Sequence, residues 1–274
     1  MTVHPSLQSS IDAWTHSIEA VTELVTPLAE GEWSRATDLP GWSVRDVVSH
    51  IIGLECEMLG DPRPIHSLPR DLYHVRSESA RRMEVQVDVR RHHTAPEMVS
   101  ELEYTVIRRS RQLRNETRQP DALVRSPFDE DRTLDFVLQL RAFDVWVHEQ
   151  DLRRALGRPG NLDAPGAHIA RDLLVKTLPV VVAKKAQAPA GSAVVFDVTG
   201  PVEFMRTVRV DAEGHGTVDG SVSLGPTVTF ALDWDVFARL ACGRSRPRAV
   251  ADQIKIDGDQ ELATAILENF AVTP

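Results

Sequence analysis

Cysteine is scarce in this chain of 274 residues, and its two cysteines, Cys56 and Cys242, follow no spacing typical of a metal or redox motif. The sequence has neither a signal-peptide pattern nor a run of about 18 apolar residues, so we expect a cytoplasmic protein with no membrane partner. Motifs of enzyme nucleophiles and of phosphate-binding glycine loops are also missing. We therefore expect no protein nucleophile, and we interpret both cysteines as small buried hydrophobes.

Positive charge is in deficit, with 31 Lys and Arg against 40 Asp and Glu and a formal net charge of −9. Nucleic-acid binding needs a concentrated basic face, and no helix-turn-helix with a basic recognition helix stands out. Nucleic acid is therefore not an expected partner, and a transcriptional regulator is disfavoured. Arginine greatly outnumbers lysine, a bias that often accompanies a GC-rich genome.

Helical periodicity dominates the first two-thirds of the chain. Ser43 and Asp46 have the spacing of a capping box at the start of one helix, and Thr133 and Gly157 are typical first and last residues of another. The pattern predicts helices over residues 11–28, 43–58, 96–118, 133–157 and 166–186, and a long, partly helical connection over residues 61–96.

The composition changes after residue 189, where short alternating segments between glycine-containing turns predict strands. A short helix near residues 234–242, a strand over 252–258 and a terminal helix over 258–270 follow. The expected fold class is α+β, with a helical bundle over residues 1–188 and a small α/β domain over residues 189–274.

Three side chains are candidates for a metal site: His50, Asp144 and His148. Asp144 and His148 are four positions apart on one predicted helix, so they project from nearly the same face. His50 lies beside the apolar stripe of the second helix and should point into the bundle, where two imidazoles and a carboxylate would suit zinc or a similar ion. From spacing alone, a solvated Asp–His pair and a hydrogen-bonded interior histidine remain open alternatives.

Two segments carry a resemblance to a known family. The run WSRATDLPGWSVRDVVSH, residues 33–50, and the run RAFDVWVHEQDL, residues 141–152, resemble motifs of the mycothiol-dependent maleylpyruvate isomerase family. The segments ACGR, residues 241–244, and IDGD, residues 256–259, are similar to elements of that family's second domain. The resemblance implies a DinB-like four-helix metal-binding bundle followed by a sterol-carrier-like domain, with His50, Asp144 and His148 as metal ligands.

The acid of the second motif departs from the family pattern, which usually has glutamate where this chain has Asp144. Aspartate is one methylene shorter, whereas metal–ligand distances tolerate only about 0.2 Å. The helix must then lie closer to the metal, water must bridge the gap, or the metal binds weakly. Nearby, Asp151 is placed either to orient the His148 imidazole or to pair with Arg153 or Arg154. Glu57 is interpreted as a polar residue at the rim of the site.

The resemblance also implies the chemistry. The expected cofactors are a divalent metal, zinc first, and mycothiol, the low-molecular-weight thiol of actinobacteria, whose thiolate would add to an unsaturated acid or another small electrophile. Isomerisation and thiol transfer both remain open, and Arg244 is the candidate to hold substrate carboxylates, with a surface or interdomain ion pair as its other interpretation. A binding module without turnover is the alternative function, and either a monomer or a homodimer is compatible with the sequence.

Overall fold

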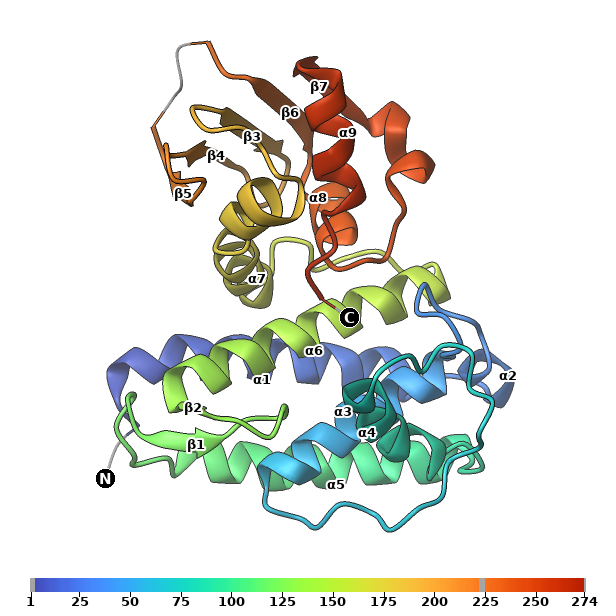
Figure 1. Cartoon of the computed structure of the whole chain (residues 1–274). Helices are drawn as coiled ribbons and strands as arrows, with labels where there is room; N and C mark the ends of the chain where they lie inside the picture. Colours follow the sequence, from blue (N-terminus) through green and yellow to red (C-terminus); the bar gives the residue numbers. More distant parts are fainter. Residues whose placement is uncertain (1–2, 222–224, 274) are drawn as a thin grey trace. The chain divides into compact units, whose positions relative to one another are not determined.

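The computed structural model describes residues 3–221 and 225–273, and the chain forms two compact units, Met1–Ile169 and Ala170–Pro274 (Figure 1). The division falls inside the helix Pro165–Val175, whereas the sequence placed the boundary after residue 188. The two differ because the segment after Ala170 contacts the strands and the last helix of the second unit. Among the described helices, none is both long enough and apolar enough to cross a membrane.

The first unit is built on four long helices: α1 (Pro5–Val25), α3 (Val44–Met58), α5 (Ala95–Arg114) and α6 (Leu134–Leu156). Two capping predictions are confirmed. Ser43 and Asp46 form a reciprocal capping box at the start of α3, and Thr133 accepts a hydrogen bond from the Phe136 amide at the start of α6. Gly157 ends α6 in the left-handed conformation, with φ of 66°.

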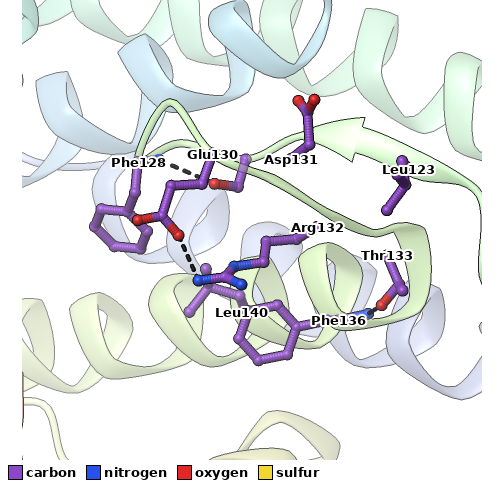
Figure 2. A pocket seen from close by; sticks show the side chains of 9 residues that line it. Leu123, Phe128, Glu130, Asp131, Arg132, Thr133, Phe136 and Leu140 are labelled. Carbon is purple, nitrogen blue, oxygen red and sulfur yellow. Dashed lines mark hydrogen bonds and ion pairs between the residues drawn. The ribbon is translucent and has the colours of Figure 1, made fainter.

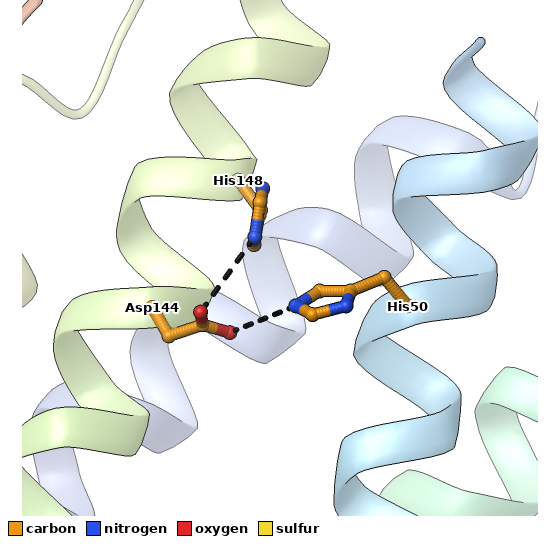
Figure 3. A group of neighbouring side chains, drawn as sticks. All are labelled: His50, Asp144 and His148. Atoms are coloured by element: carbon orange, nitrogen blue, oxygen red, sulfur yellow. Dashed lines mark ion pairs between the residues drawn. The ribbon is translucent and has the colours of Figure 1, made fainter. Parts of the chain in front are cut away.

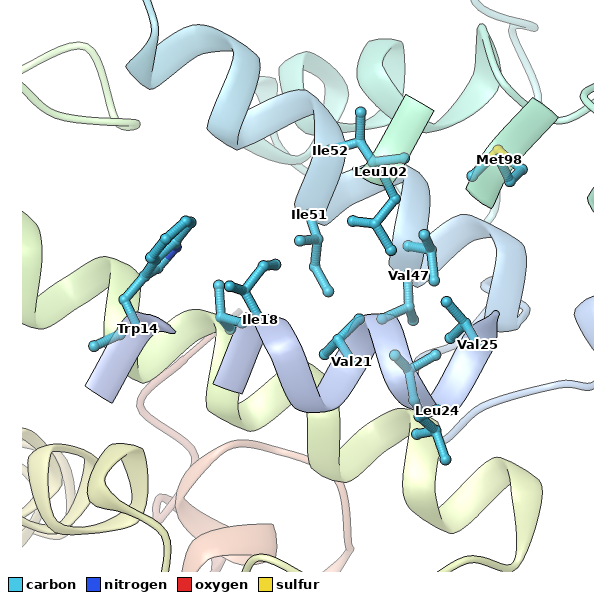
Figure 4. Close-up of a cluster of buried hydrophobic side chains, with 14 of the residues drawn as sticks. Trp14, Ile18, Val21, Leu24, Val25, Val47, Ile51, Ile52, Met98 and Leu102 are labelled. Carbon is cyan, nitrogen blue, oxygen red and sulfur yellow. The ribbon is translucent and has the colours of Figure 1, made fainter. Parts of the chain in front are cut away.

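The core of this unit lies where apolar stripes of different helices meet (Figure 4). Ile18 and Val21 of α1 lie close to Ile51 of α3, and Leu102 of α5 adds to the same cluster. All four side chains are buried. The α1 helix also packs along α6, so the helix with the candidate pair Asp144 and His148 is fixed by the same core that fixes α3.

Shorter elements join the long helices. The helix α2 (Glu30–Trp33) follows α1, and α4 (Glu78–Asp88) is the helical part of the connection over residues 61–96. A hairpin of β1 (Leu123–Arg125) and β2 (Asp131–Thr133) precedes α6 and has no counterpart in the sequence prediction. Its strands are three residues each and mostly exposed, so they lack the alternating apolar pattern that identifies a strand.

The second unit contains, in its described residues, one five-stranded sheet of order β5-β4-β3-β6-β7. Its strands are β3 (Ala193–Thr199), β4 (Phe204–Val210), β5 (Gly216–Asp219), β6 (Val228–Asp233) and β7 (Ile254–Gly258). The pair β3–β6 is parallel and the other three pairs are antiparallel. These strands were predicted, although part of the segment 216–224 lies outside the described residues.

Helices complete the second unit: α8 (Trp234–Ala241), a 3-10 segment (Pro247–Gln253) and α9 (Gln260–Glu268). The prediction of one helix over residues 166–186 was wrong, because α7 (Pro165–Val175) ends early and a π-helical segment (Val180–Lys185) follows. Pro179 lies between them and cannot donate a backbone hydrogen bond, so an uninterrupted α-helix is disfavoured there. The α+β fold class, with a helical first part and a small sheet domain, is confirmed.

Gly41 is required by the turn that leads into α3. Its φ is 79°, and an added Cβ would lie 2.4 Å from Nδ1 of His74. We expect Gly41→Ala to lower the free energy of unfolding by more than the roughly 1 to 2 kcal/mol of the left-handed conformation alone. Gly60→Ala is the matched control, since Gly60 has φ of 87° and no atom within 4 Å of the added Cβ. Equal losses in urea denaturation would show that His74 does not restrict this turn.

Candidate metal centre

The structure brings His50, Asp144 and His148 together, although His50 comes from α3 and the other two come from α6 (Figure 3). The Nε2 atom of His50 lies 3.7 Å from Oδ2 of Asp144, and Nε2 of His148 lies 3.6 Å from Oδ1 of the same carboxylate. The two imidazole rings have centroids 4.8 Å apart. One atom from each residue can be chosen so that all three lie within 4.8 Å of one another.

The electrostatics of this cluster favour a neutral His50 beside an ionised Asp144. Burial lowers the pKa of His50 and outweighs the opposite effect of Asp144. Burial by itself would raise the pKa of Asp144, but the charge of the adjacent Arg141, the largest opposing influence, holds it well below its usual range. At neutral pH, His50 therefore offers a free lone pair and Asp144 a negative charge, the forms in which these groups bind metals.

Asp151 connects the candidate ligands to the surface of α6. Its Oδ2 lies 3.1 Å from Nδ1 of His148, and its Oδ1 accepts a hydrogen bond of 2.6 Å from Arg154. Asp151 therefore does both things that the sequence suggested. One of its oxygens contacts His148, and the other accepts the hydrogen bond from Arg154. The contact at Nδ1 leaves Nε2 of His148 directed at Asp144, as a ligating tautomer requires.

Trp42 forms a wall of the cluster that sequence reasoning missed. Its indole ring lies 5.1 Å from the His50 ring and 6.3 Å from the His148 ring. The indole Nε1 donates a 3.0 Å hydrogen bond to Glu84 of α4, a buried acid that also pairs with Arg91. The connection between α3 and α5 therefore holds one side of the site. In the sequence, the run PGW at residues 40–42 was the available sign that a tryptophan lies at the turn before α3.

Glu55 and Arg141 lie beneath the cluster and were also missed. The Arg141 guanidinium donates to Glu55 through Nε, at 3.0 Å, and to Asp144 through a terminal nitrogen, at 2.8 Å. Both Glu55 and Arg141 are 1% exposed. Arg141 begins the RAFDVWVH run, but its partner could not be predicted, because Glu55 is on a different helix.

The two residues beyond Glu55 on α3 take no part in the cluster. Glu57 pairs with Arg63 and accepts a hydrogen bond from Gln86, as expected for a polar residue away from the ligands. Cys56 lies 3.7 Å from the hydroxyl of Thr105, and burial raises the pKa of its thiol. A raised pKa disfavours the thiolate, so Cys56 is not an activated nucleophile.

The donor set is suited to a divalent cation. In a tetrahedral zinc site the metal–nitrogen bonds are about 2.0 to 2.1 Å, so neighbouring ligand atoms lie about 3.4 Å apart. The two carboxylate–imidazole separations, one to each oxygen of Asp144, are within a few tenths of an ångström of that value, so the carboxylate reaches both imidazoles in spite of its shorter side chain. Among the described residues, Nδ1 of His50 has no hydrogen-bonding partner, although it is buried.

Two hollows in the first unit lie away from these ligands. The larger, about 600 Å³, is formed by the hairpin and the start of α6, with Phe128, Phe136 and Leu140 among its lining residues (Figure 2). The smaller, about 330 Å³, has Arg109 in its lining. Neither is lined by His50, Asp144 or His148, so neither is the ligand cluster itself.

Arg244 belongs to the second unit and lies three positions after Ala241, the last residue of α8. Its backbone amide donates to the Arg239 carbonyl, at 2.7 Å, and its guanidinium donates to the Cys242 carbonyl. Gly243 precedes it with φ of 68°, which turns the chain out of the helix. Its assignment to substrate carboxylates stays a prediction.

Comparison with known proteins places these observations in a family. Residues 14–153 match the mycothiol maleylpyruvate isomerase N-terminal domain, and residues 168–265 match the C-terminal domain of the same family. No curated protein matches the sequence. Crystal structures of a mycothiol-dependent maleylpyruvate isomerase and of a point mutant of it each match with 14% identity, 92% coverage of both chains and a TM-score of 0.57.

A sterol carrier protein domain from Helicoverpa armigera is a further match, with 22% identity, 36% coverage of this chain, 82% coverage of that domain and a TM-score of 0.29. The two family domains together account for most of the sequence, and they follow one another in the order of the two structural units. The chain belongs to the mycothiol-dependent maleylpyruvate isomerase family.

Proposed function

We propose that this protein is a metal-dependent enzyme that uses mycothiol as its nucleophile and acts on an unsaturated acid or another small electrophile. The observation that carries the proposal is the convergence of His50, Asp144 and His148 from two helices into one cluster. Membership of the family supports mycothiol as the thiol. A divalent cation held by these three residues would stabilise thiolate over thiol at neutral pH.

The residues around the cluster have distinct tasks in this proposal. Asp151 holds the His148 imidazole in the tautomer that presents Nε2. Burial keeps His50 neutral and therefore able to donate its lone pair. Trp42 shields one side of both imidazoles from water, and Glu84 fixes the indole in that position. Arg244 is proposed to bind a carboxylate of the substrate.

The reaction balances without an added oxidant or reductant. The thiolate would donate an electron pair to one carbon of an activated double bond, and the pair displaced from that bond would be delocalised onto the neighbouring carbonyl. Rotation about the former double bond, which the addition makes single, return of the pair and loss of the thiolate would give the trans isomer and regenerate the thiolate. If the adduct instead takes up a proton on carbon, the product is a stable thioether, which is the transferase outcome.

The test is a comparison of metal content, thiol binding and turnover in one preparation. We expect about one divalent ion per chain, mycothiol binding that a chelator abolishes, and consumption of maleylpyruvate or of a model electrophile only when the thiol and the metal are both present. Stoichiometric metal without thiol-dependent turnover on either kind of substrate would favour the non-catalytic binding module. A chain that retains no divalent ion would contradict the proposed metal centre.

A further inference from the structure

A buried ionic network lies directly beneath the candidate ligands. Glu55 is its centre: Oε1 accepts hydrogen bonds from Arg141 and from the indole of Trp14, and Oε2 accepts one from Arg109. The distances are between 2.7 and 3.0 Å. These residues come from α1, α3, α5 and α6, so a single carboxylate ties together the four long helices of the first unit.

Arg141 is the member of this network that reaches the site. Its Nε and one terminal nitrogen, at 3.0 and 2.7 Å, both bond the same oxygen of Glu55. The remaining terminal nitrogen donates to Oδ2 of Asp144 at 2.8 Å. Because guanidinium is planar and rigid, fixing two of its nitrogens on Glu55 also fixes the direction of the third. The hydrogen bond from Arg141 therefore fixes the orientation of the Asp144 carboxylate.

Stability alone does not account for this arrangement. Apolar residues of similar volume often replace buried ionic residues without loss of stability, so burying Glu55 with both Arg109 and Arg141 needs a further reason. The direct bond from Arg141 to Asp144 supplies one. Asp144 is the one candidate ligand with substantial exposure, about 25% of its side chain, and its carboxylate would otherwise be free to rotate into solvent.

We infer that Arg141, held by Glu55, is a positioning residue that keeps the short Asp144 side chain turned toward the two imidazoles so that all three can bind one cation. This inference rests on the proposed metal centre. It explains how a site with aspartate keeps the carboxylate within reach of both histidines, at 3.6 and 3.7 Å. It also assigns Glu55 the task of fixing the arginine.

The test compares Arg141→Met and Arg141→Lys with the wild-type protein loaded with Co²⁺. In Arg141→Met, Glu55 still has Arg109 and Trp14 as partners, so folding should survive. Lysine keeps the charge beside Glu55 but lacks the rigid planar fork of arginine, so bonding to Glu55 no longer fixes the direction of a bond to Asp144. Groups that orient metal ligands typically contribute 10- to 100-fold in metal affinity, and we expect a loss of that order in both variants, measured by competition with a chromophoric chelator.

The matched control is Arg153→Met, which removes another largely buried arginine of α6 that pairs with a buried acid, Glu149, and has no bond to Asp144. We expect its Co²⁺ affinity to stay within twofold of wild type. The visible spectrum of bound Co²⁺ should change in the Arg141 variants and not in the control, because the carboxylate is no longer held in the ligand sphere. Wild-type affinity and spectrum in both folded Arg141 variants would overturn the positioning role alone, whereas a wild-type protein that binds no Co²⁺ would overturn the metal centre with it.

Discussion

Replacing Glu55 by alanine is expected to lower the free energy of unfolding by about 3 to 5 kcal/mol, the usual effect of removing one partner from a buried ion pair. The substitution leaves the guanidiniums of Arg109 and Arg141 buried without their common carboxylate, and it removes the acceptor of the Trp14 indole. Such a loss is a large part of the roughly 5 to 15 kcal/mol that stabilises a typical domain. Urea denaturation followed by far-ultraviolet circular dichroism measures it.

Glu57→Ala is the control, because Glu57 lies on the same helix and also pairs with an arginine, Arg63, whose side chain is 36% exposed. Ion pairs with such exposure contribute about 0 to 1 kcal/mol. If Glu55→Ala and Glu57→Ala destabilise the protein equally, Glu55 does not have the central role described above.

The effect of Glu55 should also depend on pH in a defined direction. Burial alone would raise the pKa of Glu55, but the charges of Arg141 and Arg109 and the hydrogen bonds from Arg141 and Trp14 outweigh it and lower that pKa. A carboxyl with a lowered pKa in the folded state contributes its full stability above the unfolded value, about 4.3 for glutamate, and loses it as pH falls through the folded value. The difference between wild type and Glu55→Ala should therefore be constant from pH 7 to about 5 and shrink in more acidic solution.

Replacing His148 by alanine should abolish retention of a divalent ion. The change removes one of two imidazoles and leaves Asp144 with His50 as its single histidine neighbour in the cluster. Loss of a ligand should exceed the 10- to 100-fold effect of an orienting group, so we expect affinity to fall by more than about 100-fold. Metal analysis after gel filtration would then find close to one ion per chain in wild type and almost none in the variant.

His66→Ala provides the comparison for that experiment. His66 also faces a carboxylate, with Nε2 lying 2.6 Å from Asp88, but it belongs to no cluster with a second histidine in the described structure. Its replacement should leave metal content unchanged. Metal content that is unchanged in His148→Ala would remove His148 from the centre and, with it, the thiol-activation chemistry proposed for this protein.

Local sequence rules predicted the parts of the site that depend on helix geometry. The four-residue step from Asp144 to His148 fixed their common face, and the capping box at Ser43 set where α3 begins and hence where His50 points. That α3 and α6 lie side by side depends on tertiary packing, which local spacing does not determine. The expectation that His50 meets the other two residues came from the family resemblance. Spacing alone could not distinguish the cluster from a solvated pair.

The supporting residues could not be predicted, for a physical reason. Glu55 and Arg141 are charged and yet 1% exposed, so any rule that places charge at the surface assigns them wrongly. Buried residues also occur on nearly every side of α6, as the consecutive positions 145–152 illustrate, so its burial does not follow one apolar stripe. Trp42 and Glu84 depend on α4, which lies in a segment without clear periodicity.

The order of strands in the second unit has a consequence for how copies of this protein meet. In the described part of its sheet, the outermost strands are β5, of four residues, and β7, of five. Both carry exposed charged side chains, Asp219 on one and Lys255 and Asp257 on the other. Short, charged borders of this kind discourage strand-to-strand addition by a neighbouring molecule. The sheet should accordingly resist the fibrous self-association to which long apolar borders are prone, even in concentrated solution.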